Sequence, residues 1–266
     1  IALAPYFVEY GFYADNHGGE LVTAPCDGDF LPRMEAIADR ITARTRAIIL
    51  NSPNNPTGRV YPEETIRGLG ALLENRPDIT VISDEPYRAI VYDGRAVPSV
   101  LRHIPGSVVV TSASKELSLA GERIGYIAVN PAIPGKAELV GAMILATRIL
   151  GFVNAPALMQ KVLADCLHES VDVEIYRRRR DAMCSVLDGA GLTYAPPEGA
   201  FYLFVRSPVE DEVAFCAALL EERVLAVPGR GFGWPGYVRF TYCVDESIIR
   251  AAGPGIGRAV EKIRSR

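Results

Sequence analysis

The sequence lacks several patterns that would place a protein in a class at once. Its five cysteines form no CxxC pair, and its three histidines are scattered without the spacing of metal ligands. We therefore expect reduced, mostly buried thiols and no metal site. Positive charge is not in excess either, because the net charge is −4 and the pI is about 5.5. This composition predicts no nucleic-acid partner.

Long apolar runs are also missing. The longest, Leu139 to Thr147, ends at Arg148 and is too short to cross a bilayer. No secretory signal is visible. We expect a cytoplasmic protein that does not bind membranes. The run Arg177 to Arg180 would wind around a helix, so we interpret it as solvated surface.

Short apolar runs alternate with helix-like segments over residues 1–167, which we expect to form a large domain. Strands that are apolar on both faces and separated by helices are typical of a mostly parallel α/β sheet sandwiched by helices. Helices are predicted at residues 32–44 and 62–75. The predicted strands are Ala47–Leu50, Thr80–Ile82, Val108–Val110 and Ile124–Val129.

The pattern changes after about residue 167, and we expect a smaller α+β domain over residues 168–266. Gly253, Pro254 and Gly257 are expected to break or kink the last predicted helix. The predicted elements are helices at 170–187, 209–222 and 246–264, and strands at 200–205, 224–227 and 237–243.

Polar side chains follow three of the predicted strands directly, in the segments "NSPNNPTG" (51–58), "SDEPY" (83–87) and "TSASK" (111–115). Each segment alone has a structural interpretation, as a turn, a helix cap or a solvated lysine. Ligands bind at the carboxyl ends of parallel strands, however, and this order favours a site there. The side chains gathered are Asn55, Asp84, Tyr87, Ser112, Ser114 and Lys115.

That set of side chains suits pyridoxal 5′-phosphate. This cofactor needs a lysine for a Schiff base, an acidic partner for its pyridine nitrogen, hydrogen-bond donors for its ring oxygen, and hydroxyls with a cation for its phosphate. Lys115 and Asp84 match the first two needs. Asn55 and Tyr87 match the third, and Ser112 and Arg123 match the fourth.

The chain resembles the class I/II aminotransferases, fold-type I pyridoxal-phosphate enzymes that include aspartate aminotransferase. The motifs that carry the resemblance are "NSPNNPTG", "SDEPY", "SASKELSLAGERIG", "PPEGAFYLF", "VPGRGFG" and "VRFTY", in the family's order. The resemblance implies that Lys115 attaches the cofactor and moves the substrate proton, and that Asp84 pairs with the pyridine nitrogen. It implies ring-oxygen contacts from Asn55 and Tyr87.

The resemblance also implies roles for residues outside the three strand-end segments. Ser112 and Arg123 would hold the phosphate, with Ser114 a weaker candidate. Phe7, or in its place the neighbouring Tyr6, would stack on the cofactor ring, and Arg239 together with Asn55 would bind the α-carboxylate of the substrate. A core aromatic for Phe7 and a solvent-facing strand residue for Arg239 are the structural alternatives. Gly199 would lie where the backbone approaches the substrate, or in an ordinary turn.

The expected activity is amino-group transfer between an α-amino acid and a 2-oxo acid by a ping-pong mechanism. A lyase or synthase on the same fold, or a non-catalytic cofactor-binding module, remains open. The resemblance implies a homodimer with the active site at the interface, and a cis peptide at Asn55–Pro56. It does not identify the amino acid: aspartate is a default, and Arg148 fits a helix surface better than a substrate site. Family members carry a further N-terminal region, with a phosphate loop and a tyrosine that reaches the partner subunit, which we expect to be missing before Ile1.

Overall fold

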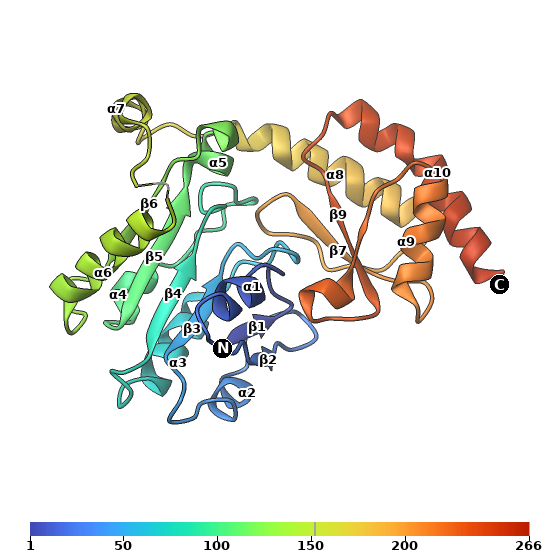
Figure 1. Ribbon diagram of the computed structural model, residues 1–266. Coiled ribbons are helices and arrows are strands. Elements are labelled where there is room, and N and C mark those ends of the chain that lie inside the picture. The colour runs from blue at the N-terminus through green and yellow to red at the C-terminus, as the bar shows by residue number, and fades with distance from the viewer. Residues whose placement is uncertain (152, 266) are drawn as a thin grey trace.

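The computed structural model describes residues 1–151 and 153–265 and contains two β-sheets (Figure 1). The larger sheet has six strands in the order β2-β1-β3-β4-β5-β6. All neighbouring strands run parallel except β6, which is antiparallel to β5. The predicted mostly parallel sheet is therefore confirmed. Its strands are β1 (Ala2–Ala4), β2 (Thr23–Pro25), β3 (Ala47–Asn51), β4 (Thr80–Asp84), β5 (Ser107–Ser112) and β6 (Gly125–Val129).

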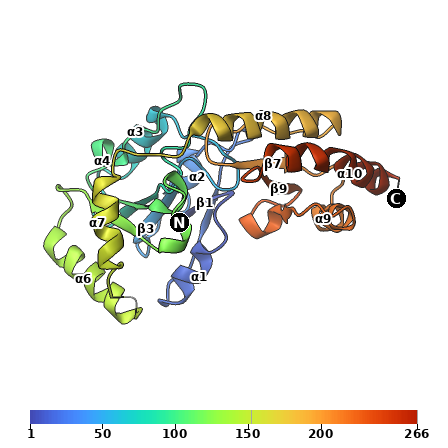
Figure 2. The same ribbon diagram turned by 90° about the horizontal axis from the view of Figure 1, so that it is seen from above.

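Helices lie on both sides of the larger sheet. Figure 2 shows α3 (Glu63–Leu72) and α4 (Val100–His103) on one side, and α1 (Tyr10–Asp15) and α6 (Lys136–Ile149) on the other. Ile48, Leu50 and Val81 point into a core shared with Leu69 of α3. The alternation of apolar residues along β3 and β4 thus buries one set of side chains beneath α3. Two further helices, α5 (Ala113–Glu116) and α7 (Ala157–Asp165), follow β5 and α6.

The helix predicted over residues 32–44 is wrong in length, because α2 spans only Met34–Ala38. The chain then turns, and the Thr42 N–H donates to Thr45 Oγ1 over 2.9 Å. Thr42 Oγ1 in turn accepts from the N–H of Arg44. Threonine hydroxyls that bond to nearby backbone groups compete with helix formation, and this explains the early end.

The second sheet has three strands in the order β7-β9-β8, and all its pairs are antiparallel. Its core joins β7, β9 and three helices through Leu203, Phe240, Leu187, Phe215 and Ile256. The domain boundary predicted at residues 167 and 168 remains a prediction. The elements of this part are α8 (Val173–Gly189), β7 (Tyr202–Arg206), α9 (Glu212–Glu221), β8 (Val227–Pro228), β9 (Tyr237–Thr241) and α10 (Glu246–Arg264).

Two predictions need correction in this second part. The strand expected at 224–227 is reduced to β8, because Arg223 turns the chain in a left-handed conformation (φ 61°) and Leu225 is exposed. The last helix does not break, since α10 is continuous with Pro254 inside it, and the kink that was the other expectation stays a prediction. Gly255 packs closely on Glu222, where an added Cβ would lie 3.2 Å from Glu222 Cβ. Close packing of α10 on its neighbours therefore outweighs the local cost of Pro254.

The arginine run also departs in part from the predicted solvated surface. Arg180 is only 11% exposed, and its Nη1 donates to Asp93 Oδ2 over 2.5 Å. Its guanidinium lies 4.8 Å from the centre of the Tyr92 ring. Arg177, in contrast, pairs with exposed Glu174 on the helix surface, as expected.

All five cysteines are free thiols, but the expectation that most are buried is wrong, because only Cys26 is buried and Cys243 is exposed. Within residues 1–151 and 153–265, no helix is long and apolar enough to cross a membrane. In the same residues, no group of three or more potential metal ligands is present.

Candidate active site

The carboxyl ends of β3, β4 and β5 bring the predicted site residues to one edge of the larger sheet. Asn51 pairs with Asp84 in the register of β3 and β4, and its Nδ2 donates to the Asp84 carbonyl over 2.8 Å. Asn51 Oδ1 accepts from the Asn55 N–H over 2.7 Å. One buried amide therefore ties the loop after β3 to the end of β4. Asn55–Pro56 is cis, as the resemblance implies.

Asp84 is held by a residue that the sequence analysis missed. The Tyr10 hydroxyl, at the start of α1, donates to Asp84 Oδ2 over 2.5 Å. Burial raises the pKa of Asp84, the hydrogen bond from Tyr10 lowers it, and neighbouring Glu85 raises it. Tyr10 thus favours the carboxylate form in a site that disfavours charge. The one sequence feature that could have indicated Tyr10 as a site residue is its position three residues after Phe7, the predicted stacking residue.

Phe7 lies beside Tyr10, and the two rings meet edge to face with their centres 5.6 Å apart. The Tyr10 N–H donates to the Phe7 carbonyl over 3.1 Å, and this closes the turn that enters α1. Phe7 is half-buried. The structure therefore places the predicted stacking residue next to the side chain that holds Asp84.

Lys115 lies in the single turn of α5 that follows β5. Ser112 caps this turn, and its Oγ accepts from the Ser114 N–H over 3.4 Å. Lys115 Nζ lies 5.8 Å from the centre of the Phe201 ring. No carboxylate in the described part of the chain pairs with it. The lysine is thus half-buried, and its amine faces the ring of Phe201, which directly precedes β7 of the second sheet.

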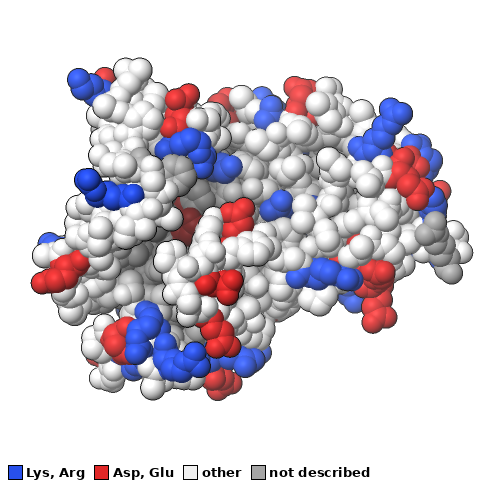
Figure 3. Space-filling view, in the orientation of Figure 1, with Lys and Arg blue, Asp and Glu red and all other residues white. Residues whose placement is uncertain are grey.

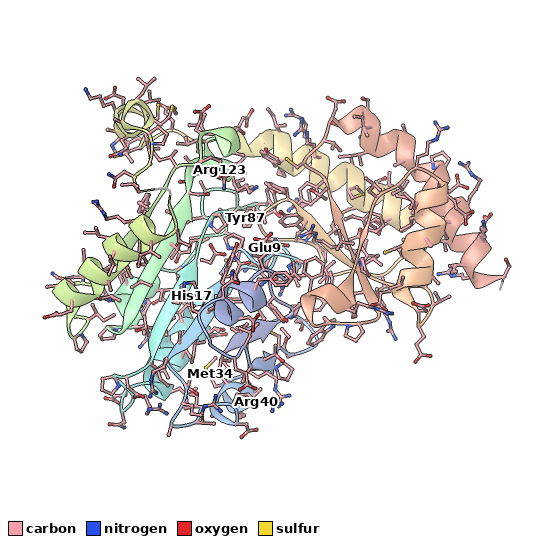
Figure 4. The ribbon with its side chains drawn as sticks, viewed as in Figure 1. Glu9, His17, Met34, Arg40, Tyr87 and Arg123 are labelled. Atoms are coloured by element: carbon pink, nitrogen blue, oxygen red, sulfur yellow. The ribbon has the colours of Figure 1, made fainter. Side chains whose placement is uncertain are left out.

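Arg123 lies at the same end of the molecule but makes no bond to the serines or the lysine among the described residues. It is exposed, adopts a left-handed conformation (φ 52°), and donates from Nη1 to the Ala120 carbonyl. Ser112 pairs with Gly125 across β5 and β6, and this brings Arg123 near the start of α5. Figure 4 shows Arg123 and Tyr87 at this end, with Met34 and Arg40 toward the other.

Tyr87 meets the second sheet through Tyr202, another residue that the sequence analysis missed. Their hydroxyl oxygens lie 2.9 Å apart, and both side chains are buried. Burial raises the pKa of Tyr87 well above its ordinary value, and Tyr202 and Asp84 raise it further. Tyr202 lies in the apolar strand β7, and the neighbouring residues in the sequence do not indicate that its hydroxyl makes a polar contact across the site.

Arg239 of β9 is packed between two aromatic rings. Its guanidinium lies 4.5 Å from the centre of Tyr202 and 4.8 Å from that of Phe232. Nη1 donates to Asn55 Oδ1 over 2.8 Å, and buried Nε has no partner. Burial lowers the pKa of Arg239, although a guanidinium remains charged at neutral pH. Arg239 therefore does not project into solvent, and it turns toward the loop of Asn55.

The two parts of the chain also meet through glycines. A Cβ on Gly199 would lie 2.8 Å from the Ile90 carbonyl oxygen and 2.8 Å from Pro53 Cγ. The Gly58 carbonyl accepts from the N–H groups of Glu198 and Gly199, each over 2.9 Å. Gly199 is thus required by close packing of backbones next to the Asn55 loop, and it is more than a turn residue.

The surface around this edge carries charges of both signs. Figure 3 shows lysines and arginines interspersed with acidic residues, and a furrow between the surface over α6 and that over α1. No single-sign field covers this face. The arrangement offers a half-buried amine, a half-buried carboxylate, three phenols and a fixed guanidinium around one edge.

Comparison with known proteins identifies the family. The family model for class I and II aminotransferases matches residues 1–253. The aspartate/prephenate aminotransferase of Thermus thermophilus is 35% identical over 95% of this chain and 66% of that protein. The aspartate aminotransferase of Bacillus subtilis is 33% identical over 97% of this chain and 69% of its own length.

A solved structure of an amino transferase from Eubacterium rectale is also similar. Its TM-score is 0.94 at 44% identity, over 98% of this chain and 67% of that one. The chain thus spans about two thirds of the length of the relatives it matches. The predicted fold-type I architecture is confirmed by this similarity. The chain belongs to the class I and II aminotransferase family.

Proposed function

We propose that this protein is a pyridoxal-phosphate-dependent aminotransferase that moves an amino group between an α-amino acid and a 2-oxo acid. The observation that carries the proposal is the environment of Arg239. Its guanidinium is fixed by two rings and Asn55, and no acidic side chain of residues 1–151 and 153–265 neutralises it. A fixed guanidinium without an acidic partner suits charge-assisted binding of a carboxylate, which every α-amino acid and 2-oxo acid carries.

The residues at the strand ends fit the cofactor that the family implies. Asp84 is a half-buried carboxyl group whose charged form the hydrogen bond from Tyr10 favours, and a protonated pyridine nitrogen would favour it further. Lys115 is an amine without an acidic partner in the described chain, and it would hold the cofactor covalently. Asn55 and Tyr87 would bind the ring oxygen. Phe7 would cover the ring, and Ser112, Ser114 and Arg123 would bind the phosphate.

Bound pyridoxal phosphate supplies an electron sink that weakens the Cα–H bond of an amino acid. The protein's part in the chemistry is then to move one proton. Once the substrate amino group has replaced it, Lys115 Nζ would accept the proton from the substrate Cα. The same amine would then donate that proton to the cofactor carbon that carries the amino group. The amine lies 5.8 Å from the centre of the Phe201 ring, at the carboxyl edge of the larger sheet where the other candidate site residues gather.

The test is a half-reaction screen of amino acids on the purified full chain with added pyridoxal phosphate. We expect the absorbance of the bound cofactor to change when a reactive amino acid is added, and a 2-oxo acid to reverse it. Aspartate is tested first, since the relatives are named for it. Release of ammonia in place of a 2-oxo acid would support the lyase alternative.

Lys115→Ala should abolish the absorbance of covalently bound cofactor. The matched control is Lys136→Ala, which removes an exposed lysine at the start of α6. A covalent band retained in Lys115→Ala would move the attachment to another of the four lysines. A wild-type chain that binds no cofactor would contradict the proposed function altogether.

We also propose a homodimer, on the strength of the exposed apolar side chains of α6. None of its residues is buried, and Ile144, Leu145 and Ile149 are 57–75% exposed. Apolar surface of this extent favours association. Sedimentation equilibrium that finds a monomer at micromolar concentration would contradict this. The cytoplasmic location stays a prediction.

A further inference from the structure

Tyr202 contacts two groups of the site at once, with different parts of its side chain. Its hydroxyl oxygen lies 2.9 Å from that of Tyr87, and its ring lies 4.5 Å from the guanidinium of Arg239. Resting on the function proposed above, we propose that Tyr202 is a positioning residue: its hydroxyl orients Tyr87, and its ring orients Arg239. The sheet supports this, since Tyr202 and Arg239 are diagonal neighbours on one face of the β7–β9 pair.

The hydroxyl of Tyr202 determines where the proton of Tyr87 points. A phenol O–H rotates freely unless a partner fixes it, and Tyr202 is its only hydrogen-bond partner among the described residues. Either hydroxyl can donate in this pair, so each phenol restricts the orientation of the other's O–H.

The ring of Tyr202 fixes the plane of the Arg239 guanidinium. The ring centre of Phe232 lies 4.8 Å from the same guanidinium, and Nη1 of Arg239 donates a hydrogen bond to Asn55 Oδ1. A guanidinium between two rings gains cation–π attraction and loses few orientations on binding a carboxylate. Without the Tyr202 ring, one face of Arg239 would be uncovered and the side chain would have other rotamers available. Tyrosine supplies both functions, whereas phenylalanine would supply only the second.

Two substitutions separate these functions. Tyr202→Phe removes the hydroxyl and keeps the ring, and Tyr202→Leu removes both. The matched control is Tyr194→Phe, which deletes a phenol hydroxyl bonded to Asp188 in the same part of the chain, away from the site. Each full-length variant is measured in two ways: by the affinity for succinate, an unreactive carboxylate, and by the pH midpoint of the absorbance of bound pyridoxal phosphate.

Tyr202→Phe should leave the affinity for succinate unchanged and shift the pH midpoint, because the Tyr87 hydroxyl loses the partner that orients it. Tyr202→Leu should also weaken succinate binding, by about tenfold. Tyr194→Phe should change neither. The proposal is overturned if Tyr202→Phe matches Tyr194→Phe in the pH midpoint, or if Tyr202→Leu binds succinate as the wild type does. Should Tyr202→Leu not fold, Tyr202→Phe alone still decides the role of the hydroxyl.

Crystal structures of the cofactor-free variants keep the proposal testable apart from the proposed function. In Tyr202→Phe, the Tyr87 hydroxyl should turn to another partner while Arg239 stays between the rings. In Tyr202→Leu, Arg239 should leave its position over residue 202. Unchanged Tyr87 and Arg239 side chains in these structures would contradict the positioning role even if the wild type binds no cofactor. A wild type that fails to bind cofactor, with both displacements present, would refute only the proposed function.

Discussion

The larger sheet and the smaller sheet contribute to the site in different ways. The larger sheet presents Asp84 at the last position of β4, and Asn55 and Lys115 in a loop and a turn that begin where β3 and β5 end. The smaller sheet presents Tyr202 and Arg239 from within its strands. Residues at or beyond the strand ends of the larger sheet do not have to pack into the interior of that sheet. Residues within the strands of the smaller sheet must serve the packing of the sheet and the site together.

This difference decides what a substitution does. A change in a loop at the edge of the larger sheet removes one functional group and leaves the sheet intact. A change at Tyr202 or Arg239 also alters the aromatic packing around Phe232 and Phe204. The two regions are joined by direct contacts, from Asn55 to Arg239 and from Gly58 to the loop of Gly199. Substitutions at these contacts test whether the two sheets respond differently to the loss of a side chain.

The largest effect is expected at the smaller sheet. Arg239→Lys keeps a positive charge but loses the planar fork and its stacking between two rings. We expect KM for amino acids to rise by about a hundredfold or more, from the loss of charge-assisted hydrogen bonds. Steady-state kinetics measure this. Arg206→Lys, an exposed position on β7, is the control and should leave KM unchanged. An unaltered KM in Arg239→Lys would place carboxylate binding elsewhere.

The contact between the two regions should be the next most sensitive. A Cβ on Gly58 would lie 2.4 Å from Pro197 Cβ and 2.9 Å from the Gly199 carbonyl oxygen, and its φ is 71°. We expect Gly58→Ala to lower the free energy of unfolding by more than about 3 kcal/mol in denaturant titrations.

Gly94→Ala separates the two causes in this prediction. Gly94 has the same φ of 71° but no atom within 4 Å of an added Cβ. It should lose only about 1 to 2 kcal/mol, the cost of a left-handed alanine. Equal losses in the two variants would show that backbone strain, and not the contact between the regions, accounts for the sensitivity of Gly58.

The same difference explains what the sequence could and could not predict. Asn55, Asp84 and Lys115 follow apolar runs directly, so their clustering follows from the rule that parallel strands end at one edge. The fold class followed from the same runs. Tyr202 lies in a stretch of buried residues from 200 to 205, and nothing local distinguishes a core tyrosine from one that bonds across the site. Only the approach of the two sheets gives it a partner.

Tyr10 and the shortened or continuous helices were missed for a related reason. The hydrogen bond from Tyr10 spans 74 residues of sequence, and α1 has only six residues. The unbroken course of α10 depends on packing against α8 and α9, which local propensity does not contain. Phe7 and Arg239 were predicted from resemblance, because their spacing alone carries no physical signal of the site.

A smaller effect is expected for Tyr10→Phe, and it depends on pH. Without this hydrogen bond the pKa of buried Asp84 should rise further, because burial then acts unopposed. A carboxyl with a raised folded-state pKa binds more protons when folded, so stability falls as the pH rises above the ordinary value of about 4. The variant should lose about 1 to 2 kcal/mol at neutral pH, and less in acid.

Thermal unfolding of the cofactor-free protein across this pH range measures the effect. Tyr13→Phe is the control, because it deletes an exposed hydrogen bond to the carboxylate of Glu9. It should have little effect at any pH. A Tyr10→Phe loss that is constant with pH would mean that the hydroxyl packs against Asp84 without tuning its charge.

The smallest effect is expected at Arg148, the one other arginine considered for substrate binding. It lies exposed in the last turn of α6, and its side chain makes no ion pair with the described residues. Arg148→Ala should change stability by less than about 0.5 kcal/mol. It should also leave the ratio of KM for aspartate to KM for alanine unchanged, whereas Arg239→Lys should raise both constants together. A rise confined to aspartate would assign Arg148 to the distal carboxylate and would add a residue of α6 to a site otherwise built from the two sheets.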